Sequence, residues 1–248
     1  MSHIQVTHFT SSDEPKLVNL WPIALPLSGA MLSQALVSLV DTALVGHLGG
    51  LALASVSIGS YLVFILVAII TGFGTGWHSL LSKQTHAHEG LMGMGLLYGV
   101  FISVALAIIG AIYAHGVIDF FVMDDRLNSL AAQYAQSRLW GLPAIVISIA
   151  ARIYWSERGS PWQYTKIILL VHLFNVLISY GLIFGVSGLP ALGAVGAGIG
   201  TSIALWIGVL LQIFLLFRQH LKPKDLSSQL SLRKSLLLLR STWPPMLQ

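Results

Sequence analysis

The fold is decided by residues 20–59, LWPIALPLSGAMLSQALVSLVDTALVGHLGGLALASVSIG, an apolar run that holds a single formal charge, Asp41. No other charged residue lies between Lys16 and Lys83. A carboxylate near the middle of a bilayer costs about 2.5–3.5 kcal/mol on insertion scales, so a sequence seldom places one there without a use for it. The stretch therefore predicts membrane-spanning helices with a functional carboxylate in the first of them.

The composition of the whole chain agrees with a membrane protein. Of the 248 residues 55% are apolar and only 9% are charged, and the mean hydropathy is +0.80. A soluble domain carries about 25% charged residues. The net charge of +4 comes from lysines and arginines in predicted loops, where orientation rules explain them, so we expect no nucleic-acid partner. The absence of cysteine excludes disulfides and thiol-based metal sites.

Apolar stretches separated by polar punctuation predict six spans, near 17–45, 51–80, 91–117, 130–155, 164–186 and 191–217. We therefore predict an all-α membrane protein. Its parts are a cytoplasmic N-terminal segment (1–16), a six-transmembrane-helix bundle (17–217), a basic cytoplasmic linker (218–231) and the start of a seventh helix (232–248). The first fifteen residues lack the basic start and apolar core of a cleaved signal peptide.

The lysines and arginines divide unequally between the two sides of this bundle. Arg126 is on one side, and the other side holds Lys16, Lys83, Arg158, Lys166, Arg218, Lys222, Lys224, Arg233, Lys234 and Arg240. Because positive loops stay inside, we expect a multi-pass protein of the inner (plasma) membrane with its N-terminus in the cytoplasm.

The first predicted span carries a polar stripe. Gln34, Ser38 and Asp41 follow one another at i, i+4 and i+7, which is one helix face. Pro26, earlier in the same span, removes a backbone hydrogen bond and favours a bend. The alternative is that Asp41 lies at the outer end of its helix and reaches interfacial water, since the helix rises about 36 Å from residue 17 to this point.

The fifth predicted span carries a second stripe, His172, Asn175 and Ser179, at i, i+3 and i+7. An asparagine could bind a cation through its carbonyl oxygen or hydrogen-bond a protonated carboxyl. The plainer interpretation is hydrogen bonding between helices, worth less than about 1–2 kcal/mol, and for Asn175 alone this is preferred. For His172 we likewise prefer such bonding, or a hydrated position, to a proton carrier.

The sixth predicted span opens with GAVGAGIGTS, residues 193–202. The surroundings of a nucleotide-binding glycine loop are missing, because no hydrophilic strand precedes the run and no acidic residue follows it. Small residues at helical spacing, such as Gly196 and Gly200, let two membrane helices approach closely. Thr201 then brings a hydroxyl to a packed region, where packing is its default role and contact with a cation the sharper alternative.

The fourth predicted span carries Arg138 and Arg152, fourteen residues apart and so on one helix face. Neither is expected to face lipid. We prefer that both reach the membrane surfaces at the two ends of the helix. Arg138 is nevertheless retained as a candidate cavity-lining residue, with Gln34, Ser38 and His172, because an arginine facing the substrate would select against cations.

Enzymatic chemistry is not indicated. The cluster His86, His88 and Glu89 could bind zinc, but the spacing is weak evidence and a solvated loop is preferred, so we expect no metal site. The chain has no GxSxG, HExxH or Walker-type loop, hence no predicted catalytic residues and no ATP hydrolysis. Any transport would then run on an ion gradient, without a cofactor.

Several motifs, in order along the chain, resemble the multidrug and toxic compound extrusion (MATE) transporters, and most of all their DinF branch. They are the opening segment quoted above with its proline and VDTA, the loop SERGSPWQYTK (156–166), and the pair NVLISYGLIFG (175–185) and GAVGAGIGTSIA (193–204). The resemblance implies twelve helices in two six-helix lobes, and export of organic molecules in exchange for Na⁺ or H⁺.

The resemblance also implies a coupling site in the amino-terminal lobe. Asp41 matches the family's carboxylate on a bent first helix, Asn175 its helix-five asparagine and Thr201 its helix-six threonine. Ser179 stands where the family has a second acid. Losing that negative charge weakens a Na⁺ site, because hard cations prefer charged oxygens, whereas a single buried acid still exchanges a proton. We therefore expect H⁺ rather than Na⁺.

A further departure is length. The final LRSTWPPMLQ (239–248) resembles the start of the second lobe, and alternating access needs two bundles that rock about a central site. We expect the missing carboxy-terminal lobe, or a second chain, as a partner beside the lipid bilayer and small organic substrates. Two alternatives stay open: a flippase for lipid-linked precursors from the same superfamily, and a truncated fragment that transports nothing. An intramembrane enzyme is the most distant alternative.

Overall fold

The computed structural model describes residues 21–83 and 88–219. All regular elements in this part of the chain are helices, and it contains no strands. The helices run in the order α1 (Trp21–Gly46), α2 (Gly50–Lys83), α3 (His88–Asp119), α4 (Asp125–Leu139), α5 (Leu142–Glu157), α6 (Pro161–Phe184), the short 3₁₀ helix η1 (Val186–Gly188) and α7 (Gly193–Gln219). The predicted N-terminal segment, nearly all of the predicted linker and the start of a seventh helix lie outside the described residues. Arg218 and Gln219 are helical, so α7 extends two residues into the predicted linker.

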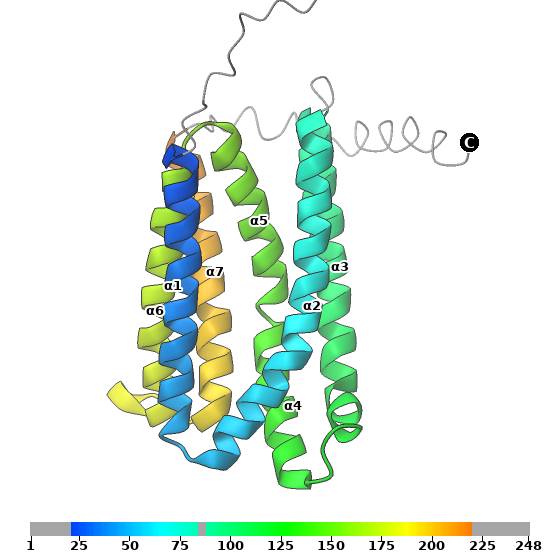
Figure 1. Ribbon diagram of the computed structural model, residues 1–248, viewed down its shortest axis with the longest axis vertical. Coiled ribbons are helices and arrows are strands. Elements are labelled where there is room, and N and C mark those ends of the chain that lie inside the picture. The colour runs from blue at the N-terminus through cyan, green and yellow to red at the C-terminus, as the bar shows by residue number, and fades with distance from the viewer. Residues whose placement is uncertain (1–20, 84–87, 220–248) are drawn as a thin grey trace, which may run out of the picture.

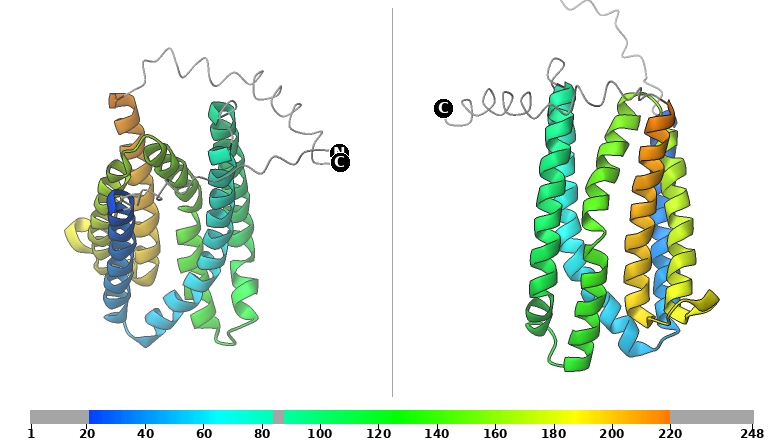
Figure 2. Two further views of the ribbon diagram at one scale, coloured as in Figure 1. Left: turned by 45° about the horizontal axis from the view of Figure 1, so that its top comes forward. Right: turned by 180° about the vertical axis from the view of Figure 1, so that it is seen from behind.

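The helices form two groups, α1 with α6 and α7, and α2 with α3, and α4–α5 runs between them (Figures 1 and 2). The α1–α2, α3–α4 and α6–α7 connections lie together at one end of the bundle, shown at the bottom of Figure 1. This is the up-and-down arrangement that short connections impose on successive spans.

Most of the predicted spans are confirmed within a few residues. Five described segments are long and apolar enough to cross a membrane: Gly50–Ser82, Gly90–Asp119, Asp125–Glu157, Pro161–Phe184 and Gly193–Arg218. α1 is not among these five, although its 26 residues rise about 39 Å against a hydrocarbon core about 30 Å thick. The predicted all-α bundle of a six-span lobe is therefore confirmed, with α4 and α5 together forming the fourth span.

That fourth span corrects one prediction, because it is not a single helix. α4 ends at Leu139, and α5 begins at Leu142 after a turn at Trp140 and Gly141. Pro143 occupies the first turn of α5, where its missing N–H is tolerated, and a helix running through it would lose a hydrogen bond. The two arginines therefore do not share one face of one straight helix.

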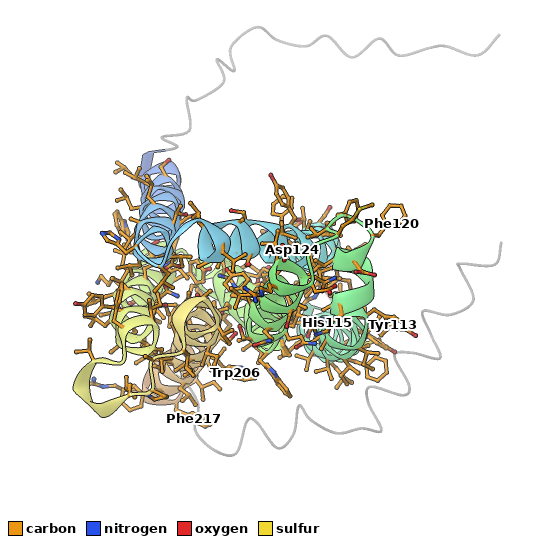
Figure 3. All side chains as sticks on the ribbon, turned by 90° about the horizontal axis from the view of Figure 1, so that it is seen from below. Tyr113, His115, Phe120, Asp124, Trp206 and Phe217 are labelled. Carbon is orange, nitrogen blue, oxygen red and sulfur yellow. The ribbon has the colours of Figure 1, made fainter. Side chains whose placement is uncertain are left out.

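Side chains of α7 donate hydrogen bonds to backbone carbonyl groups at the break between α4 and α5. Ser202 Oγ donates to the carbonyl oxygen of Ser137 at 2.7 Å, and Trp206 Nε1 donates to the carbonyl oxygen of Trp140 at 3.0 Å. Figure 3 shows Trp206 on the side of α7 that lies toward α4. In hydrocarbon a broken helix is stable only where such partners replace the lost backbone bonds, so α7 fixes the position of the break.

Packing differs between the two groups of helices. The largest apolar cluster joins α2, α4 and α5 around fully buried side chains such as Ile70, Leu81 and Leu142, and partly buried side chains of α3 pack against it. Between α6 and α7 the backbones themselves meet, because a Cβ placed on Gly196 would lie 2.5 Å from the carbonyl oxygen of Leu182. The predicted role of the small residues of α7 in close helix packing is therefore confirmed.

Candidate functional site

Asp41 lies five residues before the end of α1, on the helix that packs along α6. Its side chain is partly exposed, but its Oδ1 atom is buried and has no hydrogen-bond partner. Burial of Oδ1 and partial exposure of the rest of the side chain do not decide between a coupling role and the alternative that Asp41 reaches interfacial water near the end of its helix, so both stay predictions. A buried carboxylate oxygen without a donor is costly, which marks the position as one that a proton or a ligand completes.

Asn175 and Thr201 connect α6 to α7. Asn175 is 3% exposed, and its Nδ2 donates to Thr201 Oγ1 at 2.8 Å. The threonine hydroxyl in turn donates to the carbonyl oxygen of Ala197 at 2.9 Å. These bonds leave Asn175 Oδ1 buried and without a partner. The preference for plain bonding between helices thus accounts for the amide nitrogen and not for the amide oxygen.

Arg138 joins the same cluster from the end of α4. Its Nη1 donates to Thr201 Oγ1 at 3.4 Å, and it is the cationic side chain that attracts the Asp41 carboxylate electrostatically. Our preference that both arginines reach the membrane surfaces is wrong for Arg138, which is half-buried, whereas Arg152 is exposed. The physical reason is the break after Leu139, which ends α4 beside α7 and within reach of Thr201.

Ser179 is fully buried, and its Oγ has no hydrogen-bond partner. It packs against α7 at Gly200, where a Cβ would lie 2.5 Å from the serine Oγ. Because Gly200 directly precedes Thr201, the serine lies at nearly the same level of the bundle as the threonine. The expectation that Asn175 and Ser179 share a face is therefore confirmed, and that face is directed at α7.

The other candidate residues are less closely tied to this cluster. His172 is 8% exposed and its Nε2 has no partner, so this atom does not bond to another helix. Ser38 is exposed, and the described geometry of α1 includes neither the side chain of Gln34 nor that of Pro26. α1 continues through Pro26 without interruption, and the bend predicted there stays a prediction. In the cluster of His86, His88 and Glu89, which was considered as a zinc site, His86 lies outside the described residues.

Sequence reasoning missed the part that Ser202 and the α4–α5 break play in this site. The signal was present in the run Gly141–Leu142–Pro143, because a proline disfavours helical backbone at the residue before it and removes one helical bond. The break ends α4 at Leu139, beside Arg138. Ser202 holds the Ser137 carbonyl at that point, and its neighbour Thr201 accepts from the arginine side chain.

Hydrogen bonds join Arg138 and Asn175 through Thr201, and Asp41 lies on α1, which packs along α6. Three buried oxygens of these two helices have no hydrogen-bond partner: Asp41 Oδ1, Asn175 Oδ1 and Ser179 Oγ. Such atoms are rare in folded proteins, and each needs an explanation. A donor hydrogen or a small cation would satisfy them. The arrangement is therefore suited to exchanging a proton or a cation inside a helical bundle, and polar groups so placed in membrane proteins mark ion and substrate pathways.

Comparison with known proteins identifies the fold and the family. The family described as MatE matches residues 26–183. Similar curated proteins include the "Probable multidrug resistance protein NorM" of Pasteurella multocida (29% identical over 77% of this chain and 42% of the relative) and that of Synechocystis sp. (29% identical over 89% and 49%). The chain thus spans less than half the length of these relatives.

Solved structures show the same fold at low identity. One is described as an outward-facing conformation of a multidrug resistance MATE family transporter of the MOP superfamily, with a TM-score of 0.72 and 20% identity over 80% of this chain and 44% of that one. Another, with the same scores and coverage, is a MOP superfamily transporter from Pyrococcus furiosus whose binding pocket is described as having reverse polarity. Since the family match covers more than half of the residues, this multi-pass membrane chain belongs to the MatE family of transporters, as its motifs predicted.

Proposed function

We propose that this chain forms the amino-terminal lobe of a secondary transporter of the DinF-like branch that exports small organic compounds in exchange for protons. The observation that carries the proposal is the set of buried, unpartnered oxygens on α1 and α6, two helices that pack along each other, since a structure with no use for them would pair them or replace them with apolar groups. The names of the relatives, which describe multidrug resistance, support export of organic compounds.

The coupling begins with protonation of Asp41. A proton neutralises the carboxylate and supplies a donor hydrogen to a region where acceptors are in excess. The loss of charge allows α1 to bend further at Pro26, which narrows the cavity and displaces the substrate outward, and deprotonation resets the cycle. The proton favours the bent form of the lobe and the substrate favours the straight form, so the two do not bind together. Exchange requires this mutual exclusion.

Transport requires a second lobe, because alternating access in such folds rocks one bundle against another about a central site. We propose that a further six-helix bundle, in the same polypeptide or in a second chain, closes the other side of the cavity. The excess of lysine and arginine at one end of the bundle supports an inner-membrane location with the N-terminus in the cytoplasm.

The decisive experiment is Asp41→Asn in the complete transporter, expressed in cells that lack their own drug exporters. We expect dye efflux to fall to the level of cells without the transporter, because an amide of the same shape cannot exchange a proton. Efflux of a fluorescent cationic dye and substrate-induced proton movement in inverted vesicles are measured together.

The matched control is Asp125→Asn, which makes the same chemical change on an exposed carboxylate at the start of α4. This variant should export at the wild-type rate. Wild-type efflux by Asp41→Asn would exclude the coupling role, and equal loss in both variants would show that the effect is not specific to the site.

The flippase alternative predicts a cavity lined by several basic side chains. In the described part of the chain Arg138 is the basic residue that reaches the cluster, and Arg152 is exposed. This geometry favours export of small compounds, and a lipid-translocation assay with reconstituted protein separates the two functions. The fragment alternative is tested by the same efflux measurement with and without a second lobe.

A further inference from the structure

Arg138 introduces a permanent positive charge into a cluster whose oxygens are suited to cations. It reaches the cluster from α4, hydrogen-bonds Thr201 and attracts the Asp41 carboxylate. Guanidinium groups remain protonated in proteins, so this charge is present at every stage of a transport cycle. Its hydrogen bond goes to a side chain of α7, whereas an arginine near the end of a membrane helix ordinarily extends to the lipid headgroups.

The hydroxyl of Thr201 has no capacity left for another ligand. A threonine hydroxyl has one hydrogen to donate and two lone pairs to accept with. The hydrogen is donated to the carbonyl oxygen of Ala197. Both lone pairs are used, one by Asn175 Nδ2 and the other by Arg138 Nη1. A metal cation could bind this oxygen only by displacing one of the two donors.

The remaining open oxygens carry one negative charge among them. Asp41 Oδ1 is charged when deprotonated, whereas Asn175 Oδ1 and Ser179 Oγ are neutral. Na⁺ is held by contacts with several oxygens, and hard cations prefer charged ones. The guanidinium already attracts this single negative charge, so a bound Na⁺ would share the carboxylate with a second positive charge in a low-dielectric region.

We infer that Arg138 is a specificity-determining residue of the coupling site: its guanidinium takes the electrostatic place of a bound Na⁺ and thereby restricts the site to protons. The same repulsion acts on a proton, but a proton forms a covalent O–H bond with Asp41, whereas Na⁺ relies on ion–dipole contacts of which Thr201 is already occupied. This inference rests on the coupling site of the proposed function and assigns its ion.

The test is equilibrium binding of radioactive Na⁺ to the purified protein in detergent, which requires no transport. Wild type should show no saturable, Asp41-dependent binding. Arg138→Gln, which keeps a donor near Thr201 but removes the charge, should gain saturable binding that disappears in Arg138→Gln combined with Asp41→Asn. The expected gain in affinity is at least about tenfold, because two unit charges as far as about 10 Å apart still exceed that factor at an effective dielectric constant near 20.

Arg152→Gln is the matched control, since it removes the same charge from an exposed position of the same span. It should bind Na⁺ no better than wild type. An equal gain in both variants would overturn the inference, as would unchanged binding in a folded Arg138→Gln. Circular dichroism and gel filtration report folding, and Arg138→Met provides a second neutral side chain of similar length if the glutamine variant does not fold.

Wild type alone can also overturn the inference, whatever the variants do. Saturable Na⁺ binding to wild type that is lost in Asp41→Asn would overturn the inference, and its absence is the baseline from which the gain in Arg138→Gln is measured. Failure of the proposed export is distinguishable, because efflux measures transport and this experiment measures occupancy. A transporter that exports dye but binds Na⁺ at Asp41 keeps the function and loses the role assigned to Arg138.

Discussion

The two sides of the bundle treat buried polar groups in opposite ways. On the side of α1, α6 and α7, four buried side-chain atoms lack partners, and within the described residues these four all belong to α1 or α6. On the side of α2 and α3, buried polar groups are satisfied. Trp77 Nε1 donates to the carbonyl oxygen of Leu91 at 3.2 Å, and Ser103 Oγ donates to that of Val100 at 2.8 Å.

Asn128 shows the contrast most clearly, because it is also a buried asparagine but bonds from α4 to α3, on the other side of the bundle from Asn175. Asn128 is 7% exposed, and its Nδ2 donates to both the His115 carbonyl oxygen and Asp119 Oδ1, each at 3.2 Å. Its Oδ1 lies 3.3 Å from His115 Nδ1. Figure 3 shows His115 and Asp124 at this end of the bundle. The Asn128 side chain therefore has partners for both its nitrogen and its oxygen, whereas the oxygen of Asn175 has none.

The difference agrees with the proposed function, which assigns ion exchange to the side of α1, α6 and α7. A fully satisfied polar network rigidifies its surroundings, whereas an unsatisfied one stores free energy that a ligand or proton can release. We call the side of α1, α6 and α7 the polar side and the side of α2 and α3 the apolar side. On the polar side, close packing between the backbones of α6 and α7 offsets the free-energy cost of the unpartnered atoms. Each of the following predictions alters one side and uses the other for comparison.

The largest effect is expected for Gly196→Ala, where α6 and α7 meet. The new Cβ would lie 2.5 Å from the Leu182 carbonyl oxygen, and this contact is to backbone, which cannot rotate away. We expect the free energy of unfolding to fall by about 3 kcal/mol, the upper part of the overpacking range. Thermal unfolding in detergent, followed by tryptophan fluorescence, measures the loss.

Gly74→Ala is the comparison from the side of α2 and α3, where the three nearest atoms to a new Cβ all belong to the side chain of Ile149, with Cγ2 at 2.9 Å. A side chain can turn, and alanine favours helix over glycine by about 0.8–1.0 kcal/mol, so the net loss should be small. Equal losses at both positions would mean that backbone contact is not what holds the polar side together.

The next effect compares the two asparagines. Asn128→Ala should lower the free energy of unfolding by about 2 kcal/mol, because Asp119 and the His115 carbonyl oxygen lose a buried donor. Asn175→Ala should cost less than about 1 kcal/mol, since it removes one unpartnered oxygen and leaves Thr201 bonded to Arg138. The same unfolding assay serves both, and a larger loss at Asn175 would contradict the division between the two sides.

The sequence predicted the bundle because length and apolarity are local properties of each span, and it singled out Asp41 because an intramembrane carboxylate is conspicuous. For Asn175 the residues alone favoured bonding between helices, and only the family resemblance implied a coupling role. The site residues on α6 followed from helical spacing, which brings Asn175 and Ser179 to one face. These inferences needed no knowledge of which helices are neighbours.

The role of Arg138 could not be predicted in this way. Its position depends on the break at Gly141 and on the contact of α4 with α7, and both are tertiary features. A continuous helix would have made an end-of-helix arginine reasonable. The proline at 143 signalled a break, but the partner that stabilises it, Ser202, lies about sixty residues further along the chain, beyond any local pattern.

The smallest effect, and the only gain in stability, is expected for Ser179→Ala. The hydroxyl is fully buried without a partner, so its removal relieves a desolvation cost of about 1 kcal/mol and leaves the close approach of Gly200 unchanged. We expect the midpoint of thermal unfolding to rise. Export by the complete transporter should fall, because one of the open oxygens of the site is lost.

Ser103→Ala is the matched change on the apolar side, at a serine that is equally buried but donates to the Val100 carbonyl oxygen. This variant should be destabilised by about 0.5–1 kcal/mol, with export unaffected. Opposite signs of the two stability changes are what the comparison requires, because only one of the two hydroxyls has its hydrogen bond in the folded protein. If both variants lose stability by the same amount, Ser179 is bonded in solution and the open site is smaller than the structure indicates.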